Sequence, residues 1–504
     1  MPLCPLVVSR RAPLEVLRVA TAALTGVALL AACGTPGVRG VAGTAPAPNV
    51  LWTPPRGAAP APPRAEGFIL PPDLAARVGQ LQLADVIDLA LRNNTATSAA
   101  WADARAAAAS YGAAKGQYYP TIALSGAAQT LKTVPSNTPF GVTRRLLSGT
   151  VTGSWLLFDF GGRTGTVSVA REALLAADWT HNATLQNVVL AVEQAYFQYL
   201  GTKALLAAQQ TTLAEAQTNL EAAQQRHKVG LATIADDLQA RTALSEARLA
   251  LEATQGQLQA TRGALALSMG LPANLPYDID VPPDTSFPLG IVEDADSLIA
   301  RAVHERPDLA AQRAQAEQAR ARLSVARAQA LPSLSLGGNA GETSLYSDSS
   351  KSFGPYRNSY SATLTLSFPL FSGWSQIYNV KAASAAAAAA ARRAAGFEQQ
   401  VIYEVFSAYY ALRTATQQVR TSRDLLASAT ESEQVALGRY KAGAGSLLDL
   451  LTAQAALASA RAQAIQARFS WNTALAQLAH DVGILGLDGK SPLRLQPDTT
   501  GTPK

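Results

Sequence analysis

The side chains that could carry out chemistry are few in this chain of 504 residues, and they are widely separated. None of the four histidines has a second histidine or a cysteine at the short spacing that metal sites need. They are His181, His227, His304 and His480. No serine, histidine and aspartate form a recognisable nucleophile arrangement, although scattered residues could still meet in the fold. We therefore predict no metal, no cofactor and no enzymatic activity.

One glycine-rich stretch, FGGRTG at 160–165, invites comparison with a phosphate-binding loop. It lacks the Gly-Lys-Ser/Thr ending with which such loops hold phosphate and magnesium. Alternating residues precede it and a long helical stretch follows. We predict a tight turn from a strand into a helix.

A second glycine motif occurs twice, as RHKVGLATIADDL (226–238) and RYKAGAGSLLDLL (439–451). Four positions repeat at an offset of 213 residues: Arg226 with Arg439, Lys228 with Lys441, Gly230 with Gly443, and Asp236 with Asp449. Cations at the end of one helix and an acid at the start of the next suit the helix dipole. We predict that Gly230, Gly443 and Gly445 let a helix reverse. From these residues alone, the two aspartates are either helix-end charges or functional groups.

Similar offsets extend over most of the chain and indicate an internal duplication. LADVIDLALRNN (83–94) matches ADSLIARAVHER (295–306), at an offset of 212 residues. Units of this length are far longer than solenoid repeats. We predict two repeats, residues 73–285 and 286–485, each with the order helix, strand, strand, helix, helix. A polar and irregular tail, 486–504, is expected to follow.

Four segments show the alternation of apolar and polar residues that is typical of strands. The expected strands are about 121–132, 149–160, 333–345 and 360–371. Residues 134–148 and 346–359 are rich in Pro, Asn, Ser and Gly, so we expect loops there. The pattern suits a membrane β-barrel, and a small soluble sheet is the alternative.

Five aromatic residues fall where the expected strands meet helices. They are Phe158, Phe160, Phe368, Phe371 and Trp374. An aromatic girdle at a membrane surface and ordinary core packing both explain them.

Long uninterrupted helices are the other expected feature. Residues 163–228 contain no proline, and a helix of this length would span about 100 Å. Leucines then recur every seven residues, which predicts a coiled-coil seam with a counterpart in the second half. The two seams are Leu244, Leu251, Leu258 and Leu265, and Leu457, Ala464, Trp471 and Leu478.

The N-terminus has the pattern of a bacterial lipoprotein. Arginines precede a short apolar stretch, and small residues precede Cys33. We predict a signal peptide over 1–32, a covalent lipid on Cys33, and a Pro- and Ala-rich tether over 33–72; an ordinary signal peptide is the alternative. The formal charge of +6 is mild for this length, so nucleic acid is not an expected partner.

Four strands cannot close a barrel by themselves, yet an open sheet edge cannot remain unpaired in lipid. Several chains must then share one barrel. Three chains would give a homotrimer with a twelve-stranded transmembrane β-barrel and a long α-helical barrel beyond it. This α+β membrane protein would present its serine and threonine side chains to a lumen.

These features together resemble the TolC-like outer-membrane factor family, especially its lipoprotein branch of multidrug efflux proteins. The resemblance rests on the lipoprotein pattern, the strand-to-helix turn at 160–165 and the duplicated glycine turn. It implies a passive exit duct in the outer membrane of a Gram-negative bacterium, in contact with membrane lipid and projecting into the periplasm. The implied partners are a periplasmic adaptor (membrane fusion) protein and an inner-membrane RND-type transporter.

The resemblance also suggests roles for the glycine turns. Asp236 and Asp449 correspond to acidic rings at a constricted periplasmic mouth, and Tyr440 to an aromatic residue that keeps the mouth shut. The residues expected at the hairpin tips, where an adaptor docks, are Arg226, Lys228, Gly230, Arg439, Lys441, Gly443 and Gly445. This chain departs from the family in having Gly445 where relatives have an arginine, and Thr452 where they often have an aspartate.

Two other functions stay open from the sequence. One is a duct for an ABC-driven (type I) protein secretion system. The other is a lipid-anchored coiled-coil scaffold without a pore, which the alternating strands disfavour.

Overall fold

The computed structural model describes residues 81–133, 142–279, 290–347, 352–486 and 495–496. The predicted signal peptide, Cys33 and the tether lie outside these residues. The helices are α3 (Leu83–Asn93), α4 (Thr95–Lys115), α5 (Gly162–Lys228), α6 (Ile234–Ser268), α7 (Ala295–Glu305), α8 (Pro307–Ala328), α9 (Ser375–Lys441) and α10 (Leu447–Val482), with a 3-10 turn at Gly116–Tyr118. No described helix is both long and apolar enough to cross a membrane.

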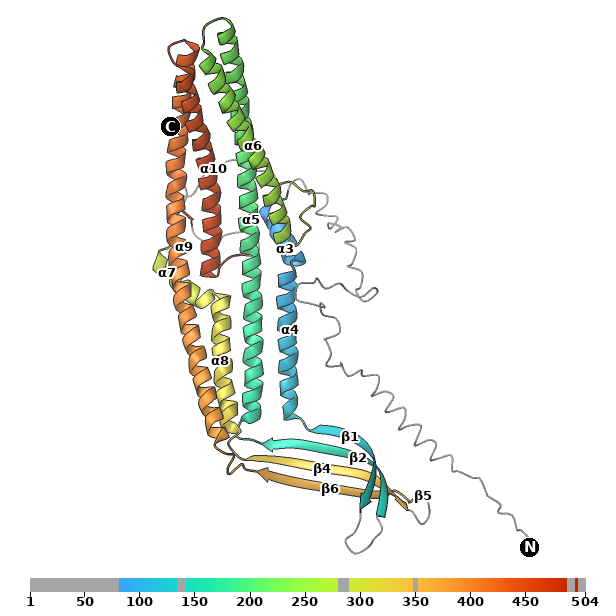
Figure 1. Ribbon diagram of the computed structural model, residues 1–504. Helices are drawn as coiled ribbons and strands as arrows, with labels where there is room; N and C mark the ends of the chain where they lie inside the picture. Colours follow the sequence, from blue (N-terminus) through green and yellow to red (C-terminus); the bar gives the residue numbers. More distant parts are fainter. Residues whose placement is uncertain (1–80, 134–141, 280–289, 348–351, 487–494, 497–504) are drawn as a thin grey trace, which may run out of the picture. The chain divides into compact units, whose positions relative to one another are not determined.

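Two helices of equal length, α5 and α9, each have 67 residues. At 1.5 Å per residue each spans about 100 Å. Shorter helices pack along them, with α4 and α6 against α5 and α8 and α10 against α9. Helix α5 also contacts α8 and α10, so the two halves of the chain form one layer of helices (Figure 1).

The leucine seam lies where the heptad spacing predicts it. In α6, Leu244 and Leu265 are buried, while Leu251 and Leu258 are half-buried. The small residues between them, Ala247, Thr254 and Thr261, are buried as well. In α10, Leu457, Trp471 and Leu478 are buried and Ala464 is half-buried. Small and branched side chains thus let α6 and α10 lie close to the long helices.

The shorter helices meet end to end at two equivalent joints. At the first, α6 ends beside the break between α3 and α4, where the Asn94 side chain donates to the Ser268 carbonyl at 3.3 Å. At the second, α10 ends beside the break between α7 and α8, where Arg306 donates to the Asp481 carbonyl at 3.4 Å. A glycine with positive φ closes each joint, Gly270 in the first and Gly483 in the second.

An antiparallel sheet follows the ends of α4 and α8 and leads back into α5 and α9. Its strands are β1 (Thr121–Thr133), β2 (Val142–Phe158), β4 (Ser333–Ser347), β5 (Ser352–Phe353) and β6 (Arg357–Ser367). Strand β2 pairs with both β1 and β4, and β4 pairs with β5 and β6. Strands β1 and β6 are therefore the edges of the sheet.

The expected strands were too short at the end of the sheet farthest from the helices. Strand β2 begins at Val142, within the segment predicted to be a loop, and β6 begins at Arg357. The short strand β5 also lies in a predicted loop. Proline, asparagine, serine and glycine predicted loops in these segments, but pairing to a neighbouring strand holds part of them extended. At its other end β6 stops at Ser367, before the predicted 371.

The register gives the sheet an apolar face and a polar face. Directly opposed residues share a face, as Ile122 with Gly153 and Leu336 with Leu364 do. The apolar face comprises Ile122, Leu124, Leu147, Val151, Trp155, Leu334, Leu336, Tyr360, Leu364 and Leu366. The polar face carries Thr121, Ser125, Thr150, Thr152, Ser154, Ser335, Asn339, Ser359, Ser361, Thr363 and Thr365. The two faces mix at the end farthest from the helices, where Leu131, Leu146 and Leu345 lie on the polar face and Thr130, Glu342 and Ser344 lie on the apolar face. Large apolar residues on the first face are exposed in the single chain.

The turn at 160–165 is a strand-to-helix turn, as predicted. Phe160 and Gly161 both have positive φ, and the Arg163 amide donates to the Asp159 carboxylate at 2.5 Å. The five aromatic residues near such turns are all exposed, so they do not form a core within one chain. The polar tail also contains structure that was not expected, because β7 (Leu495–Gln496) pairs with β3 (Gly290–Ile291).

Candidate functional site

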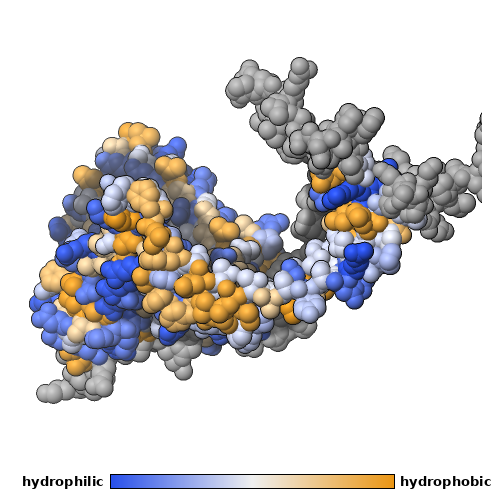
Figure 2. Space-filling model, turned by 90° about the horizontal axis from the view of Figure 1, so that it is seen from below, coloured by the Kyte–Doolittle hydropathy of each residue, from blue (hydrophilic) through white to orange (hydrophobic). Residues whose placement is uncertain are grey.

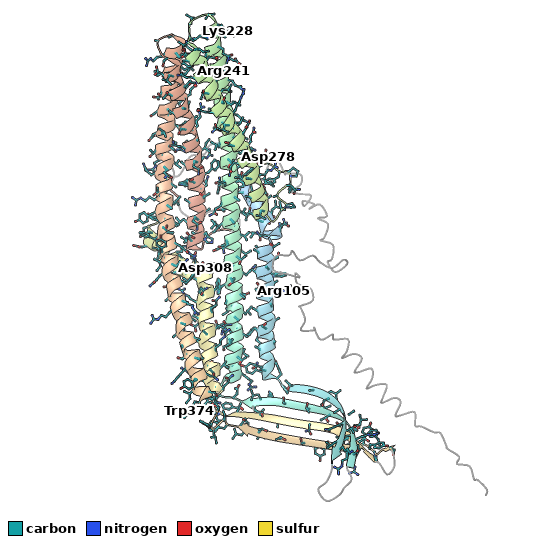
Figure 3. The ribbon with its side chains drawn as sticks, in the orientation of Figure 1. Arg105, Lys228, Arg241, Asp278, Asp308 and Trp374 are labelled. Atoms are coloured by element: carbon teal, nitrogen blue, oxygen red, sulfur yellow. The ribbon has the colours of Figure 1, made fainter. Side chains whose placement is uncertain are left out.

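The two glycine turns connect α5 to α6 and α9 to α10 at the end of the helices farthest from the sheet (Figure 3). Gly230 has φ +74° and Gly443 has φ +73°, a region that other residues rarely adopt. The amide of Leu231 donates to the Arg226 carbonyl at 2.8 Å, and that of Ala444 donates to the Arg439 carbonyl at 2.9 Å. These bonds satisfy the last carbonyls of both long helices.

Gly445 lies close to the end of α9. A Cβ atom built on it would lie 3.1 Å from the Arg439 Cβ and 3.4 Å from the Tyr440 nitrogen. A side chain at this position requires the end of α9 to shift by a few tenths of an ångström. Leu231, on the other tip, is 78% exposed, so a reactive side chain can be introduced there without disturbing a helix.

Asp236 and Asp449 each close a capping box at the start of the returning helix. The Asp236 carboxylate accepts from the Thr233 amide at 2.7 Å, and the Asp449 carboxylate accepts from the Ser446 amide at 3.2 Å. In return, each aspartate amide donates to the hydroxyl of its cap residue. Hydrogen bonds from Ser446, aided by the charge of Arg439, lower the pKa of the exposed Asp449 carboxylate below its ordinary value.

Tyr440 joins the two hairpins of one chain. It is almost fully buried, and the Arg226 guanidinium carbon lies 4.3 Å from the centre of its ring. Arg226 Nη2 also donates to the Tyr440 carbonyl at 3.1 Å. The predicted tip residue on α5 and the predicted closing residue on α9 are thus in direct contact.

A small apolar cluster lies beneath this contact. Tyr440 packs there with four buried residues from α5, α6 and α10, which are Ala223, Ala240, Leu447 and Leu450. Sequence reasoning missed a buried acid beside it, Asp237, which pairs with Arg241 at 2.9 Å. At the offset of 213 residues, Asp237 corresponds to the apolar Leu450. The comparison of the two repeats could therefore have predicted that Asp237 occupies a buried position.

The remaining predicted tip residues do not gather into one site. Lys228 and Lys441 are exposed at the helix ends, and Arg439 donates to its own turn, at the Ala444 carbonyl. Within the described chain, each aspartate is bonded to its own helix start and not to the other hairpin. The first tip also exposes four large apolar side chains, Val229, Leu231, Ile234 and Leu238.

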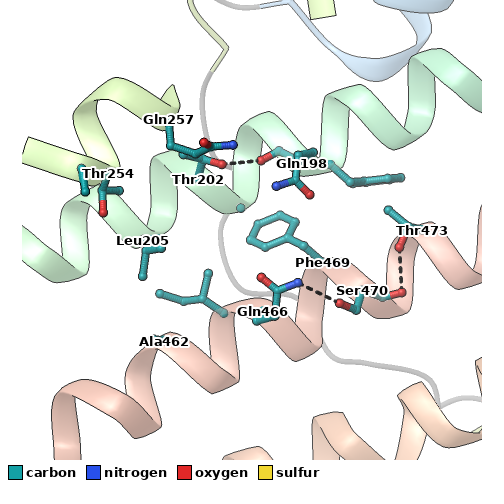
Figure 4. A pocket seen from close by; sticks show the side chains of 14 residues that line it. Gln198, Thr202, Leu205, Thr254, Gln257, Ala462, Gln466, Phe469, Ser470 and Thr473 are labelled. Atoms are coloured by element: carbon teal, nitrogen blue, oxygen red, sulfur yellow. Dashed lines mark hydrogen bonds between the residues drawn. The ribbon is translucent and has the colours of Figure 1, made fainter. Parts of the chain in front are cut away.

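A cavity between the two hairpins offers no charged side chain. A cavity of about 380 Å³ lies between α5, α6 and α10, with Phe469 and several amides and hydroxyls in its wall (Figure 4). Thr202 donates to the Gln198 carbonyl, and Gln466 donates to the Ser470 hydroxyl. Both of these bonds stay within one helix, and the residues that line the cavity include no charged side chain.

Two helical hairpins, each built on a helix about 100 Å long and joined to a sheet with an apolar and a polar face, define an outer-membrane channel protein. The chain belongs to the family described as outer membrane efflux protein, whose model matches residues 86–271 and again 298–483. This is a family of transport channels rather than of enzymes, and its location is the outer membrane of Gram-negative bacteria.

Several known proteins resemble this chain over most of its length. Protein CyaE of Bordetella pertussis is 30% identical over 441 residues, which is 86% of this chain and 92% of the relative. The probable efflux pump outer membrane protein TtgC of Pseudomonas putida is 25% identical, over 80% of this chain and 82% of its own. The crystal structure of the outer membrane protein VceC from Vibrio cholerae superposes with a TM-score of 0.70 at 19% identity, covering 80% of this chain and 96% of that one.

Proposed function

We propose that three copies of this chain form one duct, with a twelve-stranded β-barrel in the outer membrane and an α-helical barrel in the periplasm. The unpaired edges of the sheet carry this proposal. Strand β1 lacks a partner on one side and β6 lacks one on the other among the described strands. Pairing β6 of one copy with β1 of the next closes the sheet after three copies and leaves no edge in lipid.

The helices have matching edges. Helices α4 and α6 form one edge of the layer and α9 forms the other. On α9, Tyr403, Phe406 and Tyr410 are exposed in the single chain, and Trp101 of α4 and Leu267 of α6 are exposed at the opposite edge. Exposed aromatic and aliphatic residues on both edges support burial between neighbouring copies.

The duct exports small molecules that an inner-membrane RND-type transporter delivers through a periplasmic adaptor. Names such as "probable efflux pump outer membrane protein" for TtgC and "cation efflux system protein" for CusC support an efflux role. The cations and exposed apolar residues of the first tip give the adaptor a docking surface. A lipid on Cys33 adds an anchor, and the double match of the family model supports the duplication.

The mouth at the hairpin tips is a constriction lined with acids. Three copies place six carboxylates there, from Asp236 and Asp449. Hydrogen bonds hold both carboxylates at the starts of their helices, so the charges have defined positions. Such rings attract cations and raise their concentration at the constriction.

The partner is identified by cross-linking in living cells from Leu231→Cys. This thiol would be the only free one, because Cys4 leaves with the signal peptide and Cys33 carries the lipid. Recovery of an adaptor encoded beside a proton-driven transporter supports the proposal. An adaptor of an ABC exporter would reassign the duct to protein secretion, and repeated recovery of no adaptor would favour the scaffold. Lys132→Cys, on the sheet, is the matched control.

A further inference from the structure

The apolar face of the sheet ends in two cations at the edge farthest from the helices. Lys132 of β1 is opposite Thr143, and Arg145 of β2 is opposite Thr130, so the two cations are diagonal neighbours on the apolar face. Such neighbours are about 7–8 Å apart, which lets two long side chains reach one group. Both side chains are exposed.

An aromatic side chain supports one of these cations. Tyr346 of β4 is directly opposite Arg145, and the Arg145 guanidinium carbon lies 5.0 Å from the centre of the Tyr346 ring. The ring of Phe353 packs against Tyr346 at a centroid distance of 5.4 Å. The guanidinium is thus held over an aromatic surface, and its N–H groups bond to no other residue in the described part of the chain, so they can bind an anion.

The height of the cations matches the edge of a hydrocarbon layer. Ten residues separate Ile122 from Lys132 and also Trp155 from Arg145. Ten residues of strand extend about 33 Å, or about 25 Å of height at a usual barrel tilt of about 40°. If Ile122 and Trp155 lie at the inner boundary of the lipid, Lys132 and Arg145 lie at the level of the outer headgroups.

No acid neutralises this pair within the described part of the chain. Glu342, on the same face, is opposite Gly149, four residues along β2 from Arg145. Uncompensated cations at the rim of an apolar surface fit anionic headgroups. The outer leaflet of a Gram-negative outer membrane supplies them as phosphorylated glycolipid.

We propose that Lys132 and Arg145 form a binding site for the phosphate group of an outer-leaflet glycolipid, with Tyr346 positioning Arg145. The trimer would carry three such sites around the barrel. This inference rests on the proposed barrel, because only a sheet inserted in the membrane brings the apolar face to lipid. The site is distinct from the duct and its hairpin tips.

The sequence offers a matched control beside the site. Arg144 and Arg357 lie near the same end of the sheet but on the polar face, opposite Leu131 and Thr343. The test compares Lys132→Gln/Arg145→Gln with Arg144→Gln/Arg357→Gln in the purified trimer. Binding of bisphosphorylated lipid A and of its dephosphorylated form is measured by native mass spectrometry, and conductance is recorded in parallel.

The expected result is about tenfold weaker binding of bisphosphorylated lipid A by Lys132→Gln/Arg145→Gln, and less than about twofold change in the control. Tyr346→Leu should weaken binding by a few-fold. Equal losses in both double variants, or no preference of the wild type for the phosphorylated lipid, would overturn the site while leaving the duct intact. If the wild type does not conduct, the proposed barrel is wrong, and the proposed phosphate site on its outer face is wrong as well.

Discussion

Arg226 and Tyr440 are 214 residues apart in sequence, yet the guanidinium of one lies against the ring and the carbonyl of the other. This contact ties the α5–α6 hairpin to the α9–α10 hairpin within one chain. An opening of the mouth that separates the hairpins must break it. We propose that this contact stabilises the closed mouth of the proposed duct, which would then need no arginine at position 445.

Loss of this contact should favour an open mouth. Arg226→Gln removes the stacked cation and weakens the bond to the Tyr440 carbonyl, a loss of about 1–3 kcal/mol. The closed fraction in single-channel recordings should fall accordingly. Tyr440→Phe keeps the ring and the carbonyl and should behave like the wild type. Equal closed fractions in all three proteins would show that the contact plays no part in closure.

The helix joints should tolerate no side chain at their glycines. A Cβ at Gly270 would lie 2.7 Å from the Asn93 carbonyl oxygen, and one at Gly483 would lie 3.0 Å from Arg306 backbone atoms. Both glycines also have positive φ. Alanine at either position should destabilise the protein by about 2–4 kcal/mol and lower its Tm by several degrees.

Two other glycines serve as controls for the joints. Gly256 in α6 and Gly396 in α9 have open space where a Cβ would be. Alanine there should leave the Tm unchanged or raise it, since alanine favours helix by about 0.5–1 kcal/mol. A joint variant that is as stable as these controls would contradict the described geometry.

Glu193 should make stability depend on pH. It is almost fully buried beside Val189, Val192 and Tyr196, and burial raises its pKa from 4.5 to about 7. Because the folded chain holds this proton more tightly than the unfolded chain, stability falls as pH rises from about 4.5 to 7. The loss is on the order of 3 kcal/mol at most, and it persists above pH 7.

Glu193→Gln removes this dependence. Its Tm should exceed that of the wild type at pH 8, and the gain should shrink toward pH 5. Glu221→Gln, at an exposed position of the same helix, should change neither value. The interpretation fails if the difference between Glu193→Gln and the wild type is the same at both pH values.

Much of this fold could be predicted because its signals are periodic. The heptad leucines, the strand alternation and the repeated turn each come from packing or backbone geometry that local sequence records. The ends of β2 and β6 could not be predicted, because polar residues there are held by pairing to other strands. The Arg226–Tyr440 contact depends on how the hairpins pack together, and no local pattern encodes it. Buried Asp237 was missed because an adjacent aspartate matched the expected capping position.

The proposed duct is tested most directly by the conductance of the purified protein in a planar lipid bilayer. We expect the trimer to conduct ions with a preference for cations. Asp236→Asn/Asp449→Asn should reduce that preference while keeping the helix caps, because an amide oxygen can still accept the capping bond. A folded trimer that never conducts would contradict the proposal that the protein is a duct. An unchanged cation preference in the double variant would show that Asp236 and Asp449 do not line the constriction.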